Sequence, residues 1–189
     1  MKKLFLLIIS ILCVSAFTAS AEGLVIKGGA NFTNIKNVES KPFGYQFGLG
    51  FQTEIPDGFG LTFQPELVYK VVGFEYDKET LKRGYLEIPI NVQLGFNIGN
   101  ADTVHPFVFA GPYVGIGAGI FGNKATAESI QKDLKKVEYG LGLGFGIDLW
   151  IIQLTAKYNW NFGRIADATG VPELSSSPRI VEICVGLNF

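Results

Sequence analysis

The chain has 189 residues, of which 48% are hydrophobic, with 17 acidic and 16 basic side chains. The net charge of −1 argues against a nucleic-acid-binding surface, which is usually strongly basic. Of the two cysteines, Cys13 lies in the N-terminal apolar run, so Cys184 alone remains in the rest of the chain and can form neither an internal disulfide nor a cysteine-based metal site. The length suits a single domain.

The N-terminal stretch has the pattern of a secretory signal peptide. Two lysines precede an apolar run over residues 4–17, and the small residues Ala19-Ser20-Ala21 follow. A single membrane anchor is the alternative, but the run is shorter than the roughly 20 residues that a spanning helix needs. We therefore predict a signal peptide over residues 1–21 and a mature domain over residues 22–189.

The predicted domain is dominated by alternation of apolar and polar residues, which is typical of β-strands with two unlike faces. The pattern is clearest from Ile152, where Leu154 and Trp160 fall on one face and Thr155 and Asn161 on the other. The aromatic residues gather at one end of this apolar row, as they do in membrane strands. In chain order, the predicted strands are residues 24–32, 43–53, 61–69, 85–97, 107–121, 139–149, 151–162 and 179–189.

Strands of about ten residues match the length needed to cross a bilayer at a tilt. Because an open sheet would leave unpaired backbone groups in hydrocarbon, the strands have to close. We predict an all-β fold, an eight-stranded antiparallel transmembrane β-barrel with an up-and-down meander. Short connections are expected after the second, fourth and sixth strands and longer ones after the others. This alternation predicts a bacterial outer-membrane protein with both termini in the periplasm.

The polar face of the predicted strands would line the inside of the barrel. Eight strands enclose a space that side chains can fill, and charged groups there need partners or water. Four glycines that point inward, Gly140, Gly142, Gly144 and Gly146, would make room for longer side chains opposite. We predict a polar network in the lumen that contains Lys27, Glu66, Glu87, Asp148, Lys157 and Glu182.

The fifth predicted strand, residues 107–121, is nearly all apolar or glycine, so its two faces cannot be assigned from periodicity. Gly111, Gly115 and Gly119 have the spacing of a helix-packing motif, but the interior Pro112 disfavours a membrane helix. The sequence of residues 117–122 fits G-x-G-x-x-G. A dinucleotide site would need a parallel βαβ unit, and the next strand alternates instead. A short helix is expected over residues 125–136.

Three segments resemble the Bacteroidetes outer-membrane β-barrel family that includes the PorT-like proteins. They are residues 85–90 (YLEIPI), 106–113 (PFVFAGPY) and 185–189 (VGLNF). The last segment is similar to the aromatic-ended signal of barrel assembly, which would consist here of Leu187 and Phe189. The resemblance implies the same barrel fold and compartment and a link to protein secretion, and it carries over no catalytic residue.

No catalytic, cofactor or metal site is predicted. His105 is the only histidine and lies on the short-turn side, whereas a Ser-His-carboxylate hydrolase of the outer membrane needs its histidine near lipid or the outer loops. Without a second histidine, a transition-metal site has too few ligands. The segment Asp102-Thr103-Val104 resembles a Bacteroidetes O-glycosylation acceptor, although a plain polar turn is the preferred interpretation.

Our leading hypothesis is a barrel with a filled lumen and a structural or surface-interaction role. The expected partners are outer-membrane lipid, the barrel assembly machinery and an unknown surface or secretion-system protein, with no nucleic acid. One alternative is a PorT-like accessory factor in secretion. Another is a lipocalin-like barrel, which would enclose an apolar ligand and expose its polar face. An enzyme is the remaining alternative, and the missing catalytic constellation disfavours it.

Overall fold

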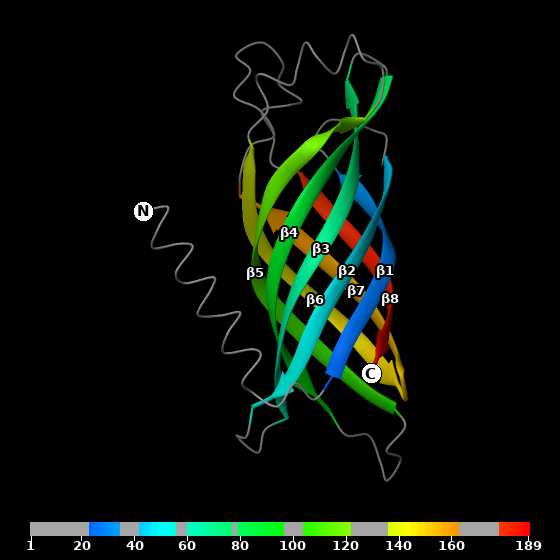
Figure 1. Ribbon diagram of the computed structural model, residues 1–189, viewed down its shortest axis with the longest axis vertical. Helices are drawn as coiled ribbons and strands as arrows, with labels where there is room; N and C mark the ends of the chain where they lie inside the picture. Colours follow the sequence, from blue (N-terminus) through cyan, green and yellow to red (C-terminus); the bar gives the residue numbers. More distant parts are fainter. Residues whose placement is uncertain are drawn as a thin grey trace, which may run out of the picture.

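The computed structural model describes residues 23–34, 42–55, 60–76, 79–96, 104–121, 136–162 and 178–189. Each strand pairs antiparallel with the next along the chain, and the last pairs with the first, so the sheet closes into a barrel of tilted strands (Figure 1). The predicted fold class is therefore confirmed. The strands are β1 (Gly23–Asn34), β2 (Phe43–Glu54), β3 (Leu61–Tyr76), β4 (Glu79–Gly95), β5 (Val104–Phe121), β6 (Val137–Leu149), β7 (Ile152–Asn161) and β8 (Arg179–Asn188).

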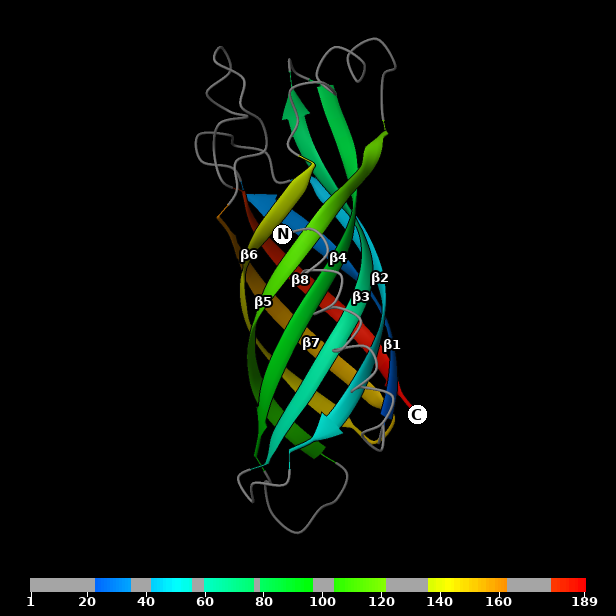
Figure 2. The ribbon, with the colours of Figure 1, turned by 60° about the vertical axis from the view of Figure 1, so that its left-hand side comes forward.

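The two ends of the barrel differ. We call the end that carries the β1–β2, β3–β4, β5–β6 and β7–β8 connections the loop end, and the opposite end the turn end. β3, β4 and β5 extend past the other strands at the loop end (Figures 1 and 2). Because β3 and β4 stay paired as far as Tyr76 and Glu79, only residues 77–78 connect them. The prediction of a longer connection after the third strand was therefore wrong.

The faces of the barrel follow the alternation in the sequence. Large apolar side chains of alternate residues lie exposed on the outer wall, such as Phe145, which is 66% exposed. Residues between them point inward and are buried, and many of these are polar, such as Gln64 and Asn91. An apolar outer wall and a polar interior suit a barrel surrounded by lipid. The lipocalin-like alternative required the reverse arrangement and is excluded.

The structure also shows which residues of β5 point inward, which could not be assigned from the sequence. Phe107, Phe109 and Tyr113 point inward and are buried, whereas Pro112 lies exposed on the outer wall. β5 pairs antiparallel with both β4 and β6, so the glycines of residues 117–121 belong to no βαβ unit. A β-bulge interrupts the register opposite Gly84 and Tyr85, and Gly119 in the bulge has φ 144°, which favours glycine.

The β6–β7 connection is the tightest turn at the turn end. Leu149 and Ile152 are paired, so only Trp150 and Ile151 lie between the strands. Trp150 has φ 57°, a conformation that bulky residues rarely adopt, and it is highly exposed. A large aromatic residue at this place fits the interface between membrane and water, where tryptophan is enriched.

Several sequence predictions concern residues outside the described part of the chain. They are the signal peptide over residues 1–21, the helix over residues 125–136, of which Lys136 alone is described, and Thr103. These stay predictions. Among the described residues, no helix is both long and apolar enough to cross a membrane.

Candidate functional site

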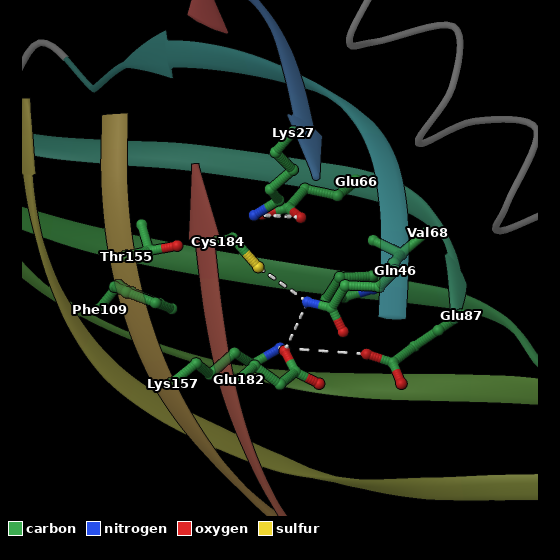
Figure 3. A pocket seen from close by; sticks show the side chains of 11 residues that line it. Lys27, Gln46, Glu66, Val68, Glu87, Phe109, Thr155, Lys157, Glu182 and Cys184 are labelled. Carbon is green, nitrogen blue, oxygen red and sulfur yellow. Dashed lines mark hydrogen bonds and ion pairs between the residues drawn. The ribbon is translucent and has the colours of Figure 1, made fainter. Parts of the chain in front are cut away.

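Four charged side chains meet in the middle of the barrel. The ammonium group of Lys70, on β3, contacts the carboxylate of Glu87, on β4, and lies 2.6 Å from Oε1 of Glu182, on β8. Lys157, on β7, places its Nζ atom 4.0 Å from the carboxylates of both Glu87 and Glu182 (Figure 3). The strands bring these residues together because each lies on the inward row of its strand, and Lys157 and Glu182 are direct cross-strand neighbours.

A second ion pair lies nearer the turn end. Lys27 on β1 places its Nζ atom 2.5 Å from Oε2 of Glu66 on β3 (Figure 3). The other carboxylate oxygen of Glu66 accepts hydrogen bonds from Gln64, at 2.9 Å, and from Asn91, at 2.8 Å. Gln93 in turn donates to the side-chain oxygen of Gln64. Both oxygens of this buried carboxylate are thus satisfied.

Neutral side chains complete the central cluster. Asn159 donates to Oε1 of Glu182 at 2.5 Å, and Gln46 donates to Oε2 at 3.2 Å. The same Gln46 nitrogen lies 2.9 Å from the sulfur of Cys184. Three lysines and three glutamates therefore neutralise one another inside the barrel: Lys27, Lys70 and Lys157 with Glu66, Glu87 and Glu182. We call these six residues the lumen charge cluster. Such pairing offsets the desolvation of each charge.

The structure places five of the six residues predicted for the lumen network in this cluster. Asp148 lies apart from it, near the end of β6. Among the described residues, Asp148 makes no ion pair and accepts hydrogen bonds from Gln153, at 3.0 Å, and Asn188, at 3.4 Å. Its position one residue before the last of its strand explains the difference, because inward residues at a strand end face the mouth of a barrel rather than its centre.

Sequence reasoning missed the most buried member of the cluster. Lys70 is 0% exposed and contacts two glutamates, but the predicted third strand ended one residue before it. Arg83 and Glu138 were missed in the same way, because they lie just before the predicted starts of the fourth and sixth strands. Both are buried, and Asn161 donates to Glu138 at 3.1 Å. Extending the alternation of each strand past its predicted end would have placed all three residues on the inward row.

Aromatic side chains fill much of the remaining space in the lumen. Phe107, Phe109 and Tyr113 on β5 lie directly opposite Gly146, Gly144 and Gly140 on β6. A Cβ atom at any of these glycines would come within 3.0 Å of the aromatic ring it faces. The lysines Lys70 and Lys157 also lie over the ring of Tyr113, at 5.4 and 5.6 Å from its centroid. The glycines thus provide the room predicted for longer side chains.

Little empty space is left around the lumen charge cluster. The cavity that Lys27, Glu66, Glu87, Lys157 and Glu182 help to line has a volume of about 10 Å³, which is about the minimum for one water molecule. A larger hollow of about 290 Å³ lies at the turn end, lined by Gly23, Gln52, Glu54, His105, Asp148, Trp150, Asn188 and Phe189. The interior between the ends is therefore nearly closed.

The chemistry that this arrangement offers is limited. His105 is paired across the sheet with Asp148 at the turn end, and the described residues contain no serine that could act with it as a nucleophile. The described residues also contain no group of three histidine, cysteine, aspartate or glutamate side chains that could hold a metal ion. Most of the charged side chains inside the barrel are already used in pairing with one another.

A comparison with known protein families assigns the chain to one of them. Residues 4–189 match the family model of the outer membrane protein beta-barrel domain. The chain belongs to this outer membrane β-barrel family. Membership agrees with the closed eight-stranded sheet and its apolar outer wall. No curated protein matches the chain at a significant level.

Solved structures show the same fold. Neisserial surface protein A matches with a TM-score of 0.55 and 15% identity, over 88% of this chain and 94% of its own. The outer membrane enzyme PagL matches with a TM-score of 0.58 and 14% identity, over 87% of this chain and 98% of its own. At such low identity the similarity concerns the fold alone. One of these two proteins is a surface protein and the other is an enzyme.

Proposed function

We propose that the protein is a non-conducting barrel of the bacterial outer membrane with a structural or surface-interaction role, performed by the residues at its loop end. The observation that supports this proposal is the neutral, nearly space-filling lumen charge cluster, with about 10 Å³ of free volume. Open aqueous channels occur in barrels of about 16 strands, whereas eight strands leave room mainly for side chains. A closed barrel acts through what it displays at its ends.

The proposal includes an orientation in which the loop end faces the outside and both termini lie in the periplasm. The longest connections between strands, residues 122–136 and 162–178, join strands at the loop end. The tight turn of Trp150 and Ile151 lies at the other end. Outer-membrane barrels combine longer external loops with short periplasmic turns. The short β3–β4 connection departs from this pattern, but its strands compensate by extending outward.

We propose further that the protein is not an enzyme. The polar side chains that a catalytic site would need are engaged in the lumen charge cluster, and His105 lies at the turn end, away from the proposed external surface. The enzyme PagL shares only the fold. Incubation of the purified protein with outer-membrane lipids, followed by mass spectrometry of the lipids, tests this point. Release or modification of an acyl chain would contradict it.

A role as a PorT-like accessory factor in secretion is the second candidate. It rests on the resemblance of residues 85–90, 106–113 and 185–189 to that family. In the structure the first of these segments supplies Glu87 to the lumen charge cluster and Pro89 to the wall of the central cavity. Deletion of the gene, followed by quantification of the secreted proteins, tests the role. Unchanged secretion would remove this candidate and leave the surface role in place.

The non-conducting barrel is tested by recording from planar lipid bilayers. We expect the purified protein to give no stable conductance of porin size, since the lumen charge cluster and the β5 aromatic residues block the path. Insertion is checked separately, by flotation with vesicles and by circular dichroism of the floated protein. Stable porin-sized steps from inserted protein would refute the filled lumen and indicate a channel function.

A further inference from the structure

A row of hydrogen-bond donors crosses three strands on the outer wall at the loop end. Arg179, the first residue of β8, is paired across the sheet with Asn34 on β1 and with Trp160 on β7. Asn34 and Arg179 lie exposed on the outer wall, and Trp160 belongs to the same face. Their side chains offer an amide, a guanidinium and an indole N–H at neighbouring positions.

Tyr158 adds a hydroxyl group to this row. Nη1 of Arg179 lies 3.4 Å from the Tyr158 hydroxyl oxygen, and the rings of Tyr158 and Trp160 meet edge to face with centroids 4.7 Å apart. Among the described residues, Arg179 has no carboxylate within ion-pair distance. Its guanidinium group therefore contacts the Tyr158 hydroxyl without a neutralising carboxylate from the described barrel. We call Asn34, Tyr158, Trp160 and Arg179 the donor row.

On β8 the donor row marks the edge of the apolar wall. From Arg179 toward the turn end, the outward residues of β8 are Val181, Ile183, Val185 and Leu187, all apolar and exposed. An arginine at the border of such a wall lies where acyl chains give way to headgroups, because its stem can pack on apolar surface while its charge reaches water. Tyrosine and tryptophan are also enriched at this depth.

We propose that the donor row binds the anionic phosphate headgroup of a membrane lipid. A guanidinium presents parallel N–H groups that match two phosphate oxygens, and the indole N–H and the tyrosine hydroxyl can donate to further oxygens. The wall below the row accommodates the acyl chains, so that a lipid fits better than a soluble phosphate. The inference requires only that the barrel be embedded in a membrane, and it does not depend on the proposed role of the loop end.

A second cation on the outer wall provides a matched control. Lys82 on β4 lies over the ring of Tyr45, with its Nζ atom 6.0 Å from the ring centroid. It carries the same charge next to an aromatic residue, but no donor row surrounds it among the described residues. A general attraction of anionic lipid to positive charge would involve Lys82 and Arg179 equally, whereas a built site depends on Arg179.

The chain contains only two tryptophans, which gives the test an internal reference. The protein is placed in phosphatidylcholine nanodiscs with increasing fractions of phosphatidylglycerol, and the indole N–H signals are followed by nuclear magnetic resonance. We expect the signal of Trp160 to shift in a saturable way, while that of Trp150 at the turn end stays in place. Equal shifts of both signals, or none for Trp160, would overturn the proposal.

Variants distinguish lipid binding at the donor row from a general attraction of anionic lipid to positive charge. Arg179→Gln should weaken the apparent affinity for phosphatidylglycerol about tenfold or more, because it removes charge-assisted hydrogen bonds, and Lys82→Gln should change it less than about twofold. If Arg179→Gln fails to fold, Tyr158→Phe, which removes one hydroxyl, should still lower the affinity. Equal losses in the Lys82 and Arg179 variants would overturn the site. A saturable shift of Trp160 with inorganic phosphate at the same concentration would overturn the lipid as its occupant.

Discussion

At the scale of single residues, Lys70 shows how a charge is kept inside the barrel. Its side chain is fully buried and contacts Glu87 and Glu182 from opposite strands. A lone ammonium group in such surroundings would be strongly destabilising, whereas two carboxylates and the nearby Tyr113 ring compensate it. Removing Lys70 therefore leaves one net negative charge at the centre of the barrel, because only Lys157, 4.0 Å away, then faces Glu87 and Glu182.

We expect Lys70→Met to lower the free energy of unfolding by about 3 to 5 kcal/mol, the usual effect of removing one partner from a buried ion pair. Methionine keeps most of the volume, so the change mainly reports the lost charge. Urea unfolding of the protein reconstituted in lipid vesicles measures the effect. Lys82→Met, at the cation on the outer wall, is the control and should change stability by less than about 1 kcal/mol. Similar losses in both variants would show that Lys70 has no special role.

Lys70 also shows why part of the interior could not be read from the sequence. After Tyr69 the chain continues Lys70-Val71-Val72, in which apolar residues occupy both faces, so the alternation that defines the strand is lost. The five predicted residues that lie in the cluster fall within segments that the alternation marked as strands. The charges that were missed lie just outside the predicted strands, because the strands continue past the point where the local pattern fades.

At the scale of elements, β5 and β6 form a complementary pair. The inward residues of β6 from Gly140 to Gly146 are all glycines, and the aromatic residues of β5 lie against three of them. Lys157 fills the space in front of the fourth, Gly142. The glycines could be assigned inward from the sequence, because their neighbours alternate. The aromatic residues of β5 could not, since apolar residues on both faces give no period.

A methyl group on this glycine wall should be destabilising. In Gly144→Ala the new Cβ atom would come closer than 3.0 Å to the Phe109 ring and to the carbonyl oxygen of Ala156, so strands β6 and β7 would have to shift. We expect a loss of about 1 to 3 kcal/mol, typical of overpacking, measured by the same unfolding assay.

Gly28 on the outer wall is the matched control for this change. Its added Cβ atom would meet the Phe47 ring at 3.4 Å, which is close to an ordinary contact. Gly28→Ala should therefore alter stability by no more than about 0.5 kcal/mol. If Gly144→Ala were equally well tolerated, the lumen would be less tightly packed than the structure shows.

At the scale of the whole molecule, the barrel has a closed middle and two different ends. The sequence predicts the order of the strands, their antiparallel pairing and their two faces. These predictions come from the alternation of apolar and polar residues and from the need to close a sheet in lipid. The unequal lengths of the strands could not be predicted from the sequence. β3, β4 and β5 continue to pair beyond the level at which the other strands end (Figure 2). Local sequence carries no signal for where a neighbouring strand stops.

The proposed orientation of these two ends can be tested by labelling intact cells. In a Cys184→Ser background, Lys136→Cys places a thiol at an exposed position of the loop end, and Ile151→Cys places one in the tight turn. The native thiol is buried, so its replacement removes residual labelling without exposing the lumen.

A membrane-impermeant maleimide should label the Lys136 variant on intact cells and the Ile151 variant only after the outer membrane is permeabilised. Both thiols lie in connections between strands at the ends of the barrel, so access to the reagent depends on the side of the membrane. Labelling of the Ile151 variant alone on intact cells would reverse the orientation and transfer the proposed surface role to the turn end.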